Sequence, residues 1–119
     1  MKDFRQLAVW EKAHKLAVAI YHATKTFPKD EIYGMISQLR RASTSISANI
    51  AEGCGGGGDS EFRRYLQIAM RSASELEYHL LYAQDVGLLN ESSYREFTSN
   101  VTEVKRMLAS LIKKLNAES

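Results

Sequence analysis

Apolar residues recur at alternating spacings of three and four along three long segments of this 119-residue chain. The first stripe consists of Ile32, Ile36, Leu39, Ser43, Ile46 and Ile50. The second consists of Phe62, Leu66, Ala69, Ala73, Leu76, Leu80 and Ala83. The third consists of Tyr94, Phe97, Val101, Val104, Leu108, Leu111 and Leu115. A mean period of about 3.5 residues keeps one face of a helix turned toward partner helices over several turns. The pattern therefore predicts three long helices that pack against one another.

A less regular amphipathic segment, residues 7–27, precedes the three stripes, so the chain has four helical segments. Helix-breaking residues lie between them. Pro28, the only proline, ends this first segment, and the glycine-rich run 53–58 separates the second from the third. Asp30 is expected to cap the second helix, and Gly87 is expected to end the third. The expected helices span approximately residues 4–26, 30–52, 59–86 and 91–115.

Short connections between helices of similar length make consecutive helices antiparallel. We therefore predict an all-α fold, a single up-down-up-down left-handed four-helix bundle that forms one domain over residues 1–119. Sixteen basic and fourteen acidic residues leave a net charge of +2, which neither demands nor excludes an anionic partner. The lone Cys54 suits a reducing compartment. The longest apolar run, residues 16–21, is too short to cross a bilayer. We expect a cytoplasmic protein that contacts no membrane.

The first and third expected helices carry more apolar residues than one buried stripe requires, whereas the outward positions of the fourth are polar. Isolated exposed apolar residues are normal on monomers, but a second stripe on two helices favours self-association. We therefore predict a homo-oligomer in which the first and third helices supply the contacts. The expected contact residues are Leu7, Trp10, His14, Tyr21, Ile68, Tyr78, Leu81 and Tyr82.

Several short motifs together resemble one known family. They are F-x-x-L-x-V-W-x-x-A at 4–13, T-F-P-x-x-E-x-Y-G at 26–34, S-I-S-A-N-I-A-E-G at 45–53, S-E-F at 60–62, S-A-S-E-L-E at 72–77 and A-x-x-x-G at 83–87. From residue 4 to about residue 94 the chain resembles the bacterial four-helix-bundle family named after the 23S rRNA intervening-sequence protein. The resemblance implies a homopentamer. It also implies a relationship to the accessory variability protein of diversity-generating retroelements, a pentamer that binds nucleic acid and a reverse transcriptase.

Four arginines form the candidate nucleic-acid surface. Antiparallel pairing about the glycine run sets Arg41 near Arg71 in height, with Arg40 and Arg64 on neighbouring turns. Guanidinium groups bind phosphates in a sequence-tolerant manner, so this group could grip RNA or DNA. The alternative is that the arginines form ion pairs, since Glu75 lies one helical turn from Arg71.

Motifs for catalysis, metals and cofactors are weak. Di-iron bundles need two Glu-x-x-His motifs, and this chain has one, Glu11 to His14. The glycine run is followed by acidic residues rather than by the Lys-Ser/Thr of a phosphate-binding loop. We therefore expect no catalytic residue, metal or cofactor. The predicted function is a non-enzymatic oligomeric assembly or adaptor protein that contacts nucleic acid or a nucleic-acid enzyme. The alternative is an enzyme or ligand-binding protein whose site forms between subunits.

Overall fold

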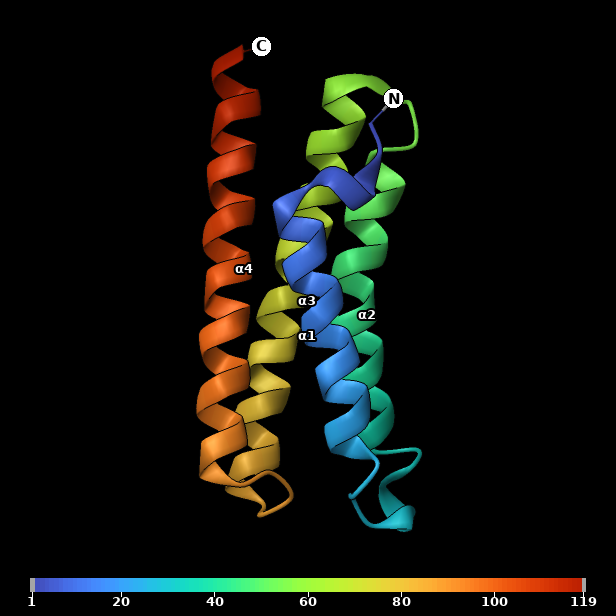
Figure 1. The fold of residues 1–119 in the computed structure, drawn as a ribbon, viewed down its shortest axis with the longest axis vertical. Helices are drawn as coiled ribbons and strands as arrows, with labels where there is room; N and C mark the ends of the chain where they lie inside the picture. The colour runs from blue at the N-terminus through green and yellow to red at the C-terminus, as the bar shows by residue number, and fades with distance from the viewer. Residues whose placement is uncertain (1, 119) are drawn as a thin grey trace.

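Four antiparallel helices form an elongated bundle of 46 × 21 × 19 Å in the computed structural model, which describes residues 2–118 (Figure 1). The helices are α1 (Ala8–Thr24), α2 (Met35–Gly53), α3 (Gly58–Asp85) and α4 (Glu91–Glu118). Two short 3₁₀ turns, η1 (Phe4–Gln6) and η2 (Lys29–Glu31), precede α1 and α2. No strand occurs within residues 2–118, so the predicted all-α four-helix bundle is confirmed.

All four helices contribute to the core, and the predicted apolar stripes of α3 and α4 supply nearly half of it. Leu66, Leu76 and Leu108 are completely buried, and an ordinary core leucine contributes about 2–5 kcal/mol relative to alanine. The α2–α3 pair makes the most extensive contact in the bundle. Small side chains allow this approach, and the hydroxyl oxygens of Ser45 and Ser72 lie 2.9 Å apart across it.

The start of α2 differs from the expectation. The helix begins at Met35 rather than at Asp30, because the chain after Pro28 forms the η2 turn and then passes through Gly34. Ile32, expected at the start of the core stripe, is 54% exposed. The first helix also starts later than expected, at Ala8, because residues 4–6 form the separate η1 turn.

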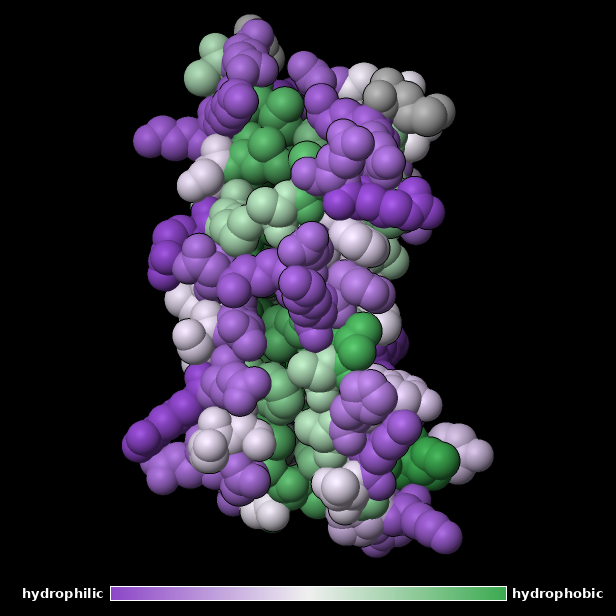
Figure 2. Space-filling model, in the orientation of Figure 1, coloured by the Kyte–Doolittle hydropathy of each residue, from purple (hydrophilic) through white to green (hydrophobic). Residues whose placement is uncertain are grey.

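The helices follow one another around the bundle, so α1 and α4 must meet to close it. Their contact is the smallest of the four neighbouring pairs. A groove of about 460 Å³ runs between the start of α1 and the C-terminal half of α4, with Leu7, Met107 and Leu111 in its lining. Figure 2 shows apolar surface along the middle of this face. No helix within residues 2–118 is long and apolar enough to span a bilayer.

Candidate functional site

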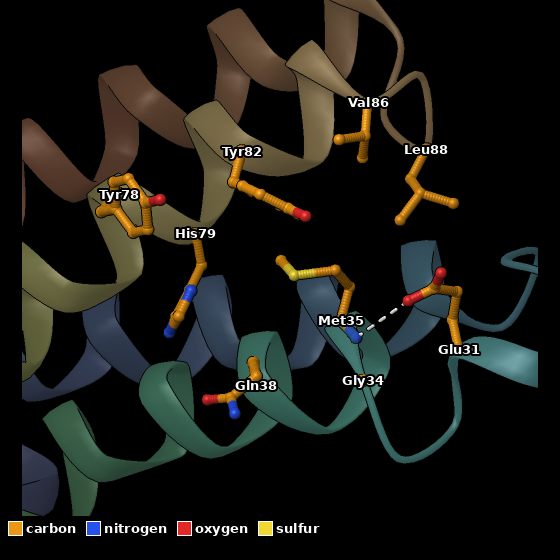
Figure 3. Close-up of a pocket in the computed structure, with 9 residues that line it drawn as sticks. All are labelled: Glu31, Gly34, Met35, Gln38, Tyr78, His79, Tyr82, Val86 and Leu88. Carbon is orange, nitrogen blue, oxygen red and sulfur yellow. Dashed lines mark hydrogen bonds between the residues drawn. The ribbon is translucent and has the colours of Figure 1, made fainter.

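A cleft of about 400 Å³ opens between the start of α2 and the end of α3, at the end of the bundle opposite the N-terminus (Figures 1 and 3). The antiparallel register brings these two segments together, as the contacts of Ser45 with Ser72 and of Arg41 with Glu75 show. The lining residues are Glu31, Gly34, Met35, Gln38, Tyr78, His79, Tyr82, Val86 and Leu88. All of them belong to one chain.

Glu31 is held at the mouth of this cleft by the first turn of α2. Its Oε1 atom accepts a hydrogen bond of 3.2 Å from the backbone N–H of Met35, which would otherwise lack a partner at the helix start. Gly34 makes room for this arrangement, because a Cβ atom on Gly34 would lie 2.9 Å from the same Oε1 atom. The carboxylate is therefore positioned by the backbone on which α2 begins.

A short polar chain lies beside the cleft. The Nε2 atom of His79 lies 3.3 Å from Oε2 of Glu75, and the same carboxylate forms an ion pair with Arg41. The hydrogen bond from Arg41 lowers the pKa of Glu75, and the contact with His79 acts in the same direction. The Glu75 side chain is 39% exposed, so solvent screening keeps this ion pair weak.

Two tyrosines form the aromatic wall of the cleft. The ring centroids of Tyr78 and Tyr82 lie 6.3 Å apart, and the two residues are 60% and 44% exposed. Leu81 and Val86 extend this apolar surface along the end of α3, and both are exposed. Ile32 and Tyr33, in the turn before α2, are exposed as well.

Of the predicted contact residues of the first helix, Leu7 and Trp10 are half-buried within the chain, whereas His14 and Tyr21 are exposed. Trp10 is half-buried, stacks on His14 at 4.8 Å and meets Phe4 edge-on at 4.9 Å. Leu7 is half-buried against the core. Tyr21 remains 47% exposed.

More of the predicted contact residues are exposed on the third helix than on the first. Tyr78, Leu81 and Tyr82 keep large exposed areas, whereas Ile68 is half-buried. The structure thus places the stronger apolar surface on α3.

The four predicted arginines lie in different settings. Arg40 turns toward α1, where its Nε donates to Thr24 Oγ1 at 2.8 Å and its guanidinium lies 4.2 Å from the centroid of the Tyr21 ring. Arg64 donates to Glu61 Oε1 at 2.7 Å. These contacts show that Arg40 and Arg64 have structural partners.

The remaining two arginines differ in their partners. Arg41 forms an ion pair with Glu75. The ion-pair alternative had expected Glu75 to pair with Arg71. Arg71 is exposed and has no ion pair or hydrogen bond with any residue in 2–118. Of the four, Arg71 is the one whose guanidinium is fully available to an external anion.

Within residues 2–118, no group of His, Cys, Asp and Glu side chains is arranged to hold a metal ion. Glu11 of the Glu-x-x-His motif instead pairs with Lys15 at 3.2 Å. Cys54 is buried, and burial raises the pKa of its thiol. A raised pKa leaves less thiolate at neutral pH, so this cysteine lacks the activation that a nucleophile requires.

Sequence reasoning identified the tyrosines of the cleft but missed Glu31, Gln38 and His79 as lining residues. With Asp30 as the expected cap, Met35 would already lie inside the helix, so no free backbone N–H was expected there for Glu31 to bind. Gly34, six positions after the proline, could have indicated that the second helix begins after residue 34 rather than at Asp30. The register between α2 and α3, which joins both halves of the cleft, has no local signature.

The sequence model of the family described as "23S rRNA-intervening sequence protein" matches residues 5–110. A crystal structure from Bacteroides thetaiotaomicron, described as a protein with unknown function from the S23 ribosomal protein family, superposes with a TM-score of 0.82. The two sequences are 30% identical, and the alignment covers 88% of this chain and 95% of that one. No functionally curated protein matches this chain.

Proposed function

This chain belongs to the 23S rRNA-intervening sequence protein family, and we propose that it acts as a non-enzymatic oligomeric assembly or adaptor protein in the cytoplasm. The observation that carries this proposal is the apolar surface of α3, where Tyr78, Leu81 and Tyr82 are all more than 40% exposed. Aromatic residues in such a surface are typical of protein–protein contacts. The free Cys54 thiol suits a reducing compartment.

The proposed assembly is a homopentamer. The α3 surface supports self-association, and the number of subunits comes from the family resemblance. Light scattering after size-exclusion chromatography tests the assembly directly, since five chains of 13.4 kDa have a combined mass of about 67 kDa. A mass near that of one chain at micromolar concentration would contradict the proposal, and a stable mass of another multiple would correct the subunit number.

The proposed partners are RNA, DNA or a nucleic-acid enzyme, and Arg71 is the residue that best supports contact with a nucleic acid. Its guanidinium is exposed and unpaired within residues 2–118, and cyclic symmetry would repeat it in every subunit. Binding through such groups consists mostly of phosphate contacts, so it weakens steeply as salt rises. Fluorescence anisotropy with labelled RNA and DNA at about 50 mM salt measures this binding.

Variants separate an arginine surface from a general charge effect. Arg71→Gln is expected to weaken binding and reduce its salt dependence, whereas Arg64→Gln removes a guanidinium that already pairs with Glu61 and should have a smaller effect. The double variant Arg41→Gln/Arg71→Gln should show the largest loss with unchanged helical content. If neither RNA nor DNA binds at low salt, the partners of the adaptor would be proteins only.

The second candidate function is a ligand-binding protein or enzyme with a site at a subunit boundary. It is favoured by the cleft beside α3, because Tyr78 and Tyr82 both line the cleft and belong to the predicted contact surface. A neighbouring subunit on α3 would then border the cleft. Pull-down from the native cytoplasm, with RNA, protein and small molecules identified, distinguishes this function from the adaptor.

A further inference from the structure

The charge inside the α2–α3 cleft is one-sided. Of its nine lining residues Glu31 is the one with a carboxylate, and no lysine or arginine lines the cleft. Glu31 forms no ion pair with any residue in the part of the chain that the structure describes. Its Oε1 atom caps α2, and its Oε2 atom has no protein donor within residues 2–118. The carboxylate therefore offers an unused acceptor to a cation in the cleft.

The remaining walls also suit a cation with an apolar stem. The faces of aromatic rings attract cations through their quadrupole, and Tyr78 and Tyr82 present two exposed rings on one wall. Figure 3 shows the side chains of Tyr82, Met35 and Glu31 on different sides of one opening. Met35, Val86 and Leu88 supply apolar surface for an alkyl chain.

We propose that this cleft binds an alkylguanidinium or alkylammonium ion, with the cationic head between the Glu31 carboxylate and the ring of Tyr82. The inference goes beyond the adaptor function, and all nine lining residues come from one chain. The same head group occurs in free amines and in the arginine and lysine side chains of a protein.

An anionic ligand fits the cleft less well. The first turn of α2 would attract an anion, but the Glu31 carboxylate already occupies the N–H group of Met35. An entering anion would have to displace Glu31 or lie against it. A metal ion is also disfavoured, since no group of ligating side chains within residues 2–118 is arranged to hold one.

Titration of the isotope-labelled protein with n-butylguanidinium, followed by amide chemical shifts, tests the proposal. Saturable shifts are expected at Gln38, His79 and Tyr82. The uncharged isostere n-butylurea should bind at least about threefold more weakly, because a hydrogen bond between two ionised groups is stronger than one in which only the carboxylate is charged. Equal affinities for the two compounds, or shifts that map elsewhere, would overturn the proposal.

Glu31→Gln is the sharpest variant, because the glutamine keeps the oxygen that caps Met35 and removes only the charge. It should weaken butylguanidinium binding by at least about threefold and weaken butylurea binding less, because butylurea carries no charge and so has no ion pair to lose. Asp30→Asn is the matched control, since Asp30 is exposed next to Glu31 but does not line the cleft. An equal loss in both variants would indicate a diffuse field and would refute a specific site.

The aromatic wall gives an independent test that does not alter the α2 cap. Tyr82→Leu should weaken binding about two- to fivefold, whereas Tyr82→Phe should retain it, since the ring face provides the attraction. Identical affinities for the leucine and phenylalanine variants would refute the aromatic contribution. N-acetyl-arginine methylamide identifies the source of the cation: tighter binding than butylguanidinium indicates a protein side chain, and equal or weaker binding indicates a free cation.

Discussion

Tyr78→Glu is the substitution that most directly tests the α3 surface as a contact between subunits. Tyr78 is 60% exposed, so a glutamate at this position can point into water in the isolated chain without disturbing the core. In an oligomer that covers this surface, the same carboxylate would have to give up its hydration. The variant should therefore remain helical and lose its assembly.

The exposed fraction of Tyr78 sets the size of the effect. A tyrosine side chain presents about 200 Å², so about 120 Å² remains open to a partner. At about 25 cal/mol per Å², covering this area is worth about 2–3 kcal/mol per contact, or about 30- to 150-fold in association. The buried carboxylate adds to this loss, so the dissociation constant should rise at least about 30-fold.

Light scattering across a dilution series from about 1 to 100 µM measures this change, with circular dichroism as the check on folding. Tyr78→Phe keeps the ring and should assemble like the natural chain. Ser99→Glu adds the same charge to the polar outer face of α4 and should also assemble normally. A folded Tyr78→Glu variant with unchanged mass throughout the series would refute the assignment of this surface to the oligomer contact.

Three further predictions concern stability and reactivity. Gly53→Val should destabilise the bundle by about 1–3 kcal/mol in urea unfolding, because even a Cβ atom would lie 2.9 Å from Cβ of Tyr65. Since Arg41 lowers the pKa of Glu75, their contact stabilises the fold above the ordinary pKa of 4.5 and is lost as the pH falls through the lowered value. Glu75→Gln should therefore be less stable than the natural chain at pH 7, by less than about 1 kcal/mol, with the difference vanishing in acid. Cys54 should react with a thiol reagent at least about tenfold faster in denaturant than in the folded protein, because burial raises its pKa and blocks access.

Long periodic segments could be predicted from sequence because their signal repeats over many turns. Leu66, Leu76 and Leu108 lie on regular stripes, and all three are fully buried. Ile32 continues such a stripe by spacing alone, yet it lies before the start of α2. Periodicity does not indicate where a helix begins; the proline and Gly34 determine that here, through backbone geometry.

The candidate site was predictable only in part, because its two walls come from segments far apart in the chain. Tyr78 and Tyr82 stood out as apolar residues on an outward face. Glu31 became visible as a site residue only when the register of α2 against α3 placed it opposite them. Tyr21 also stood out in the sequence, but Arg40 from α2 lies over its ring, a contact with no local signature.

The small contact between α1 and α4 has a consequence for how the folded chain fluctuates. Separating α1 from α4 breaks fewer packing contacts than separating any other neighbouring pair. Transient opening of the bundle should therefore start along this seam between α1 and α4. Amide protons in the last turns of α4 should therefore exchange with solvent faster than those in the middle of α2 and α3. A molecule that bridged Leu7 and Leu111 across the seam would slow this exchange selectively, which makes hydrogen exchange a sensitive reporter of partners that bind far from the α3 surface.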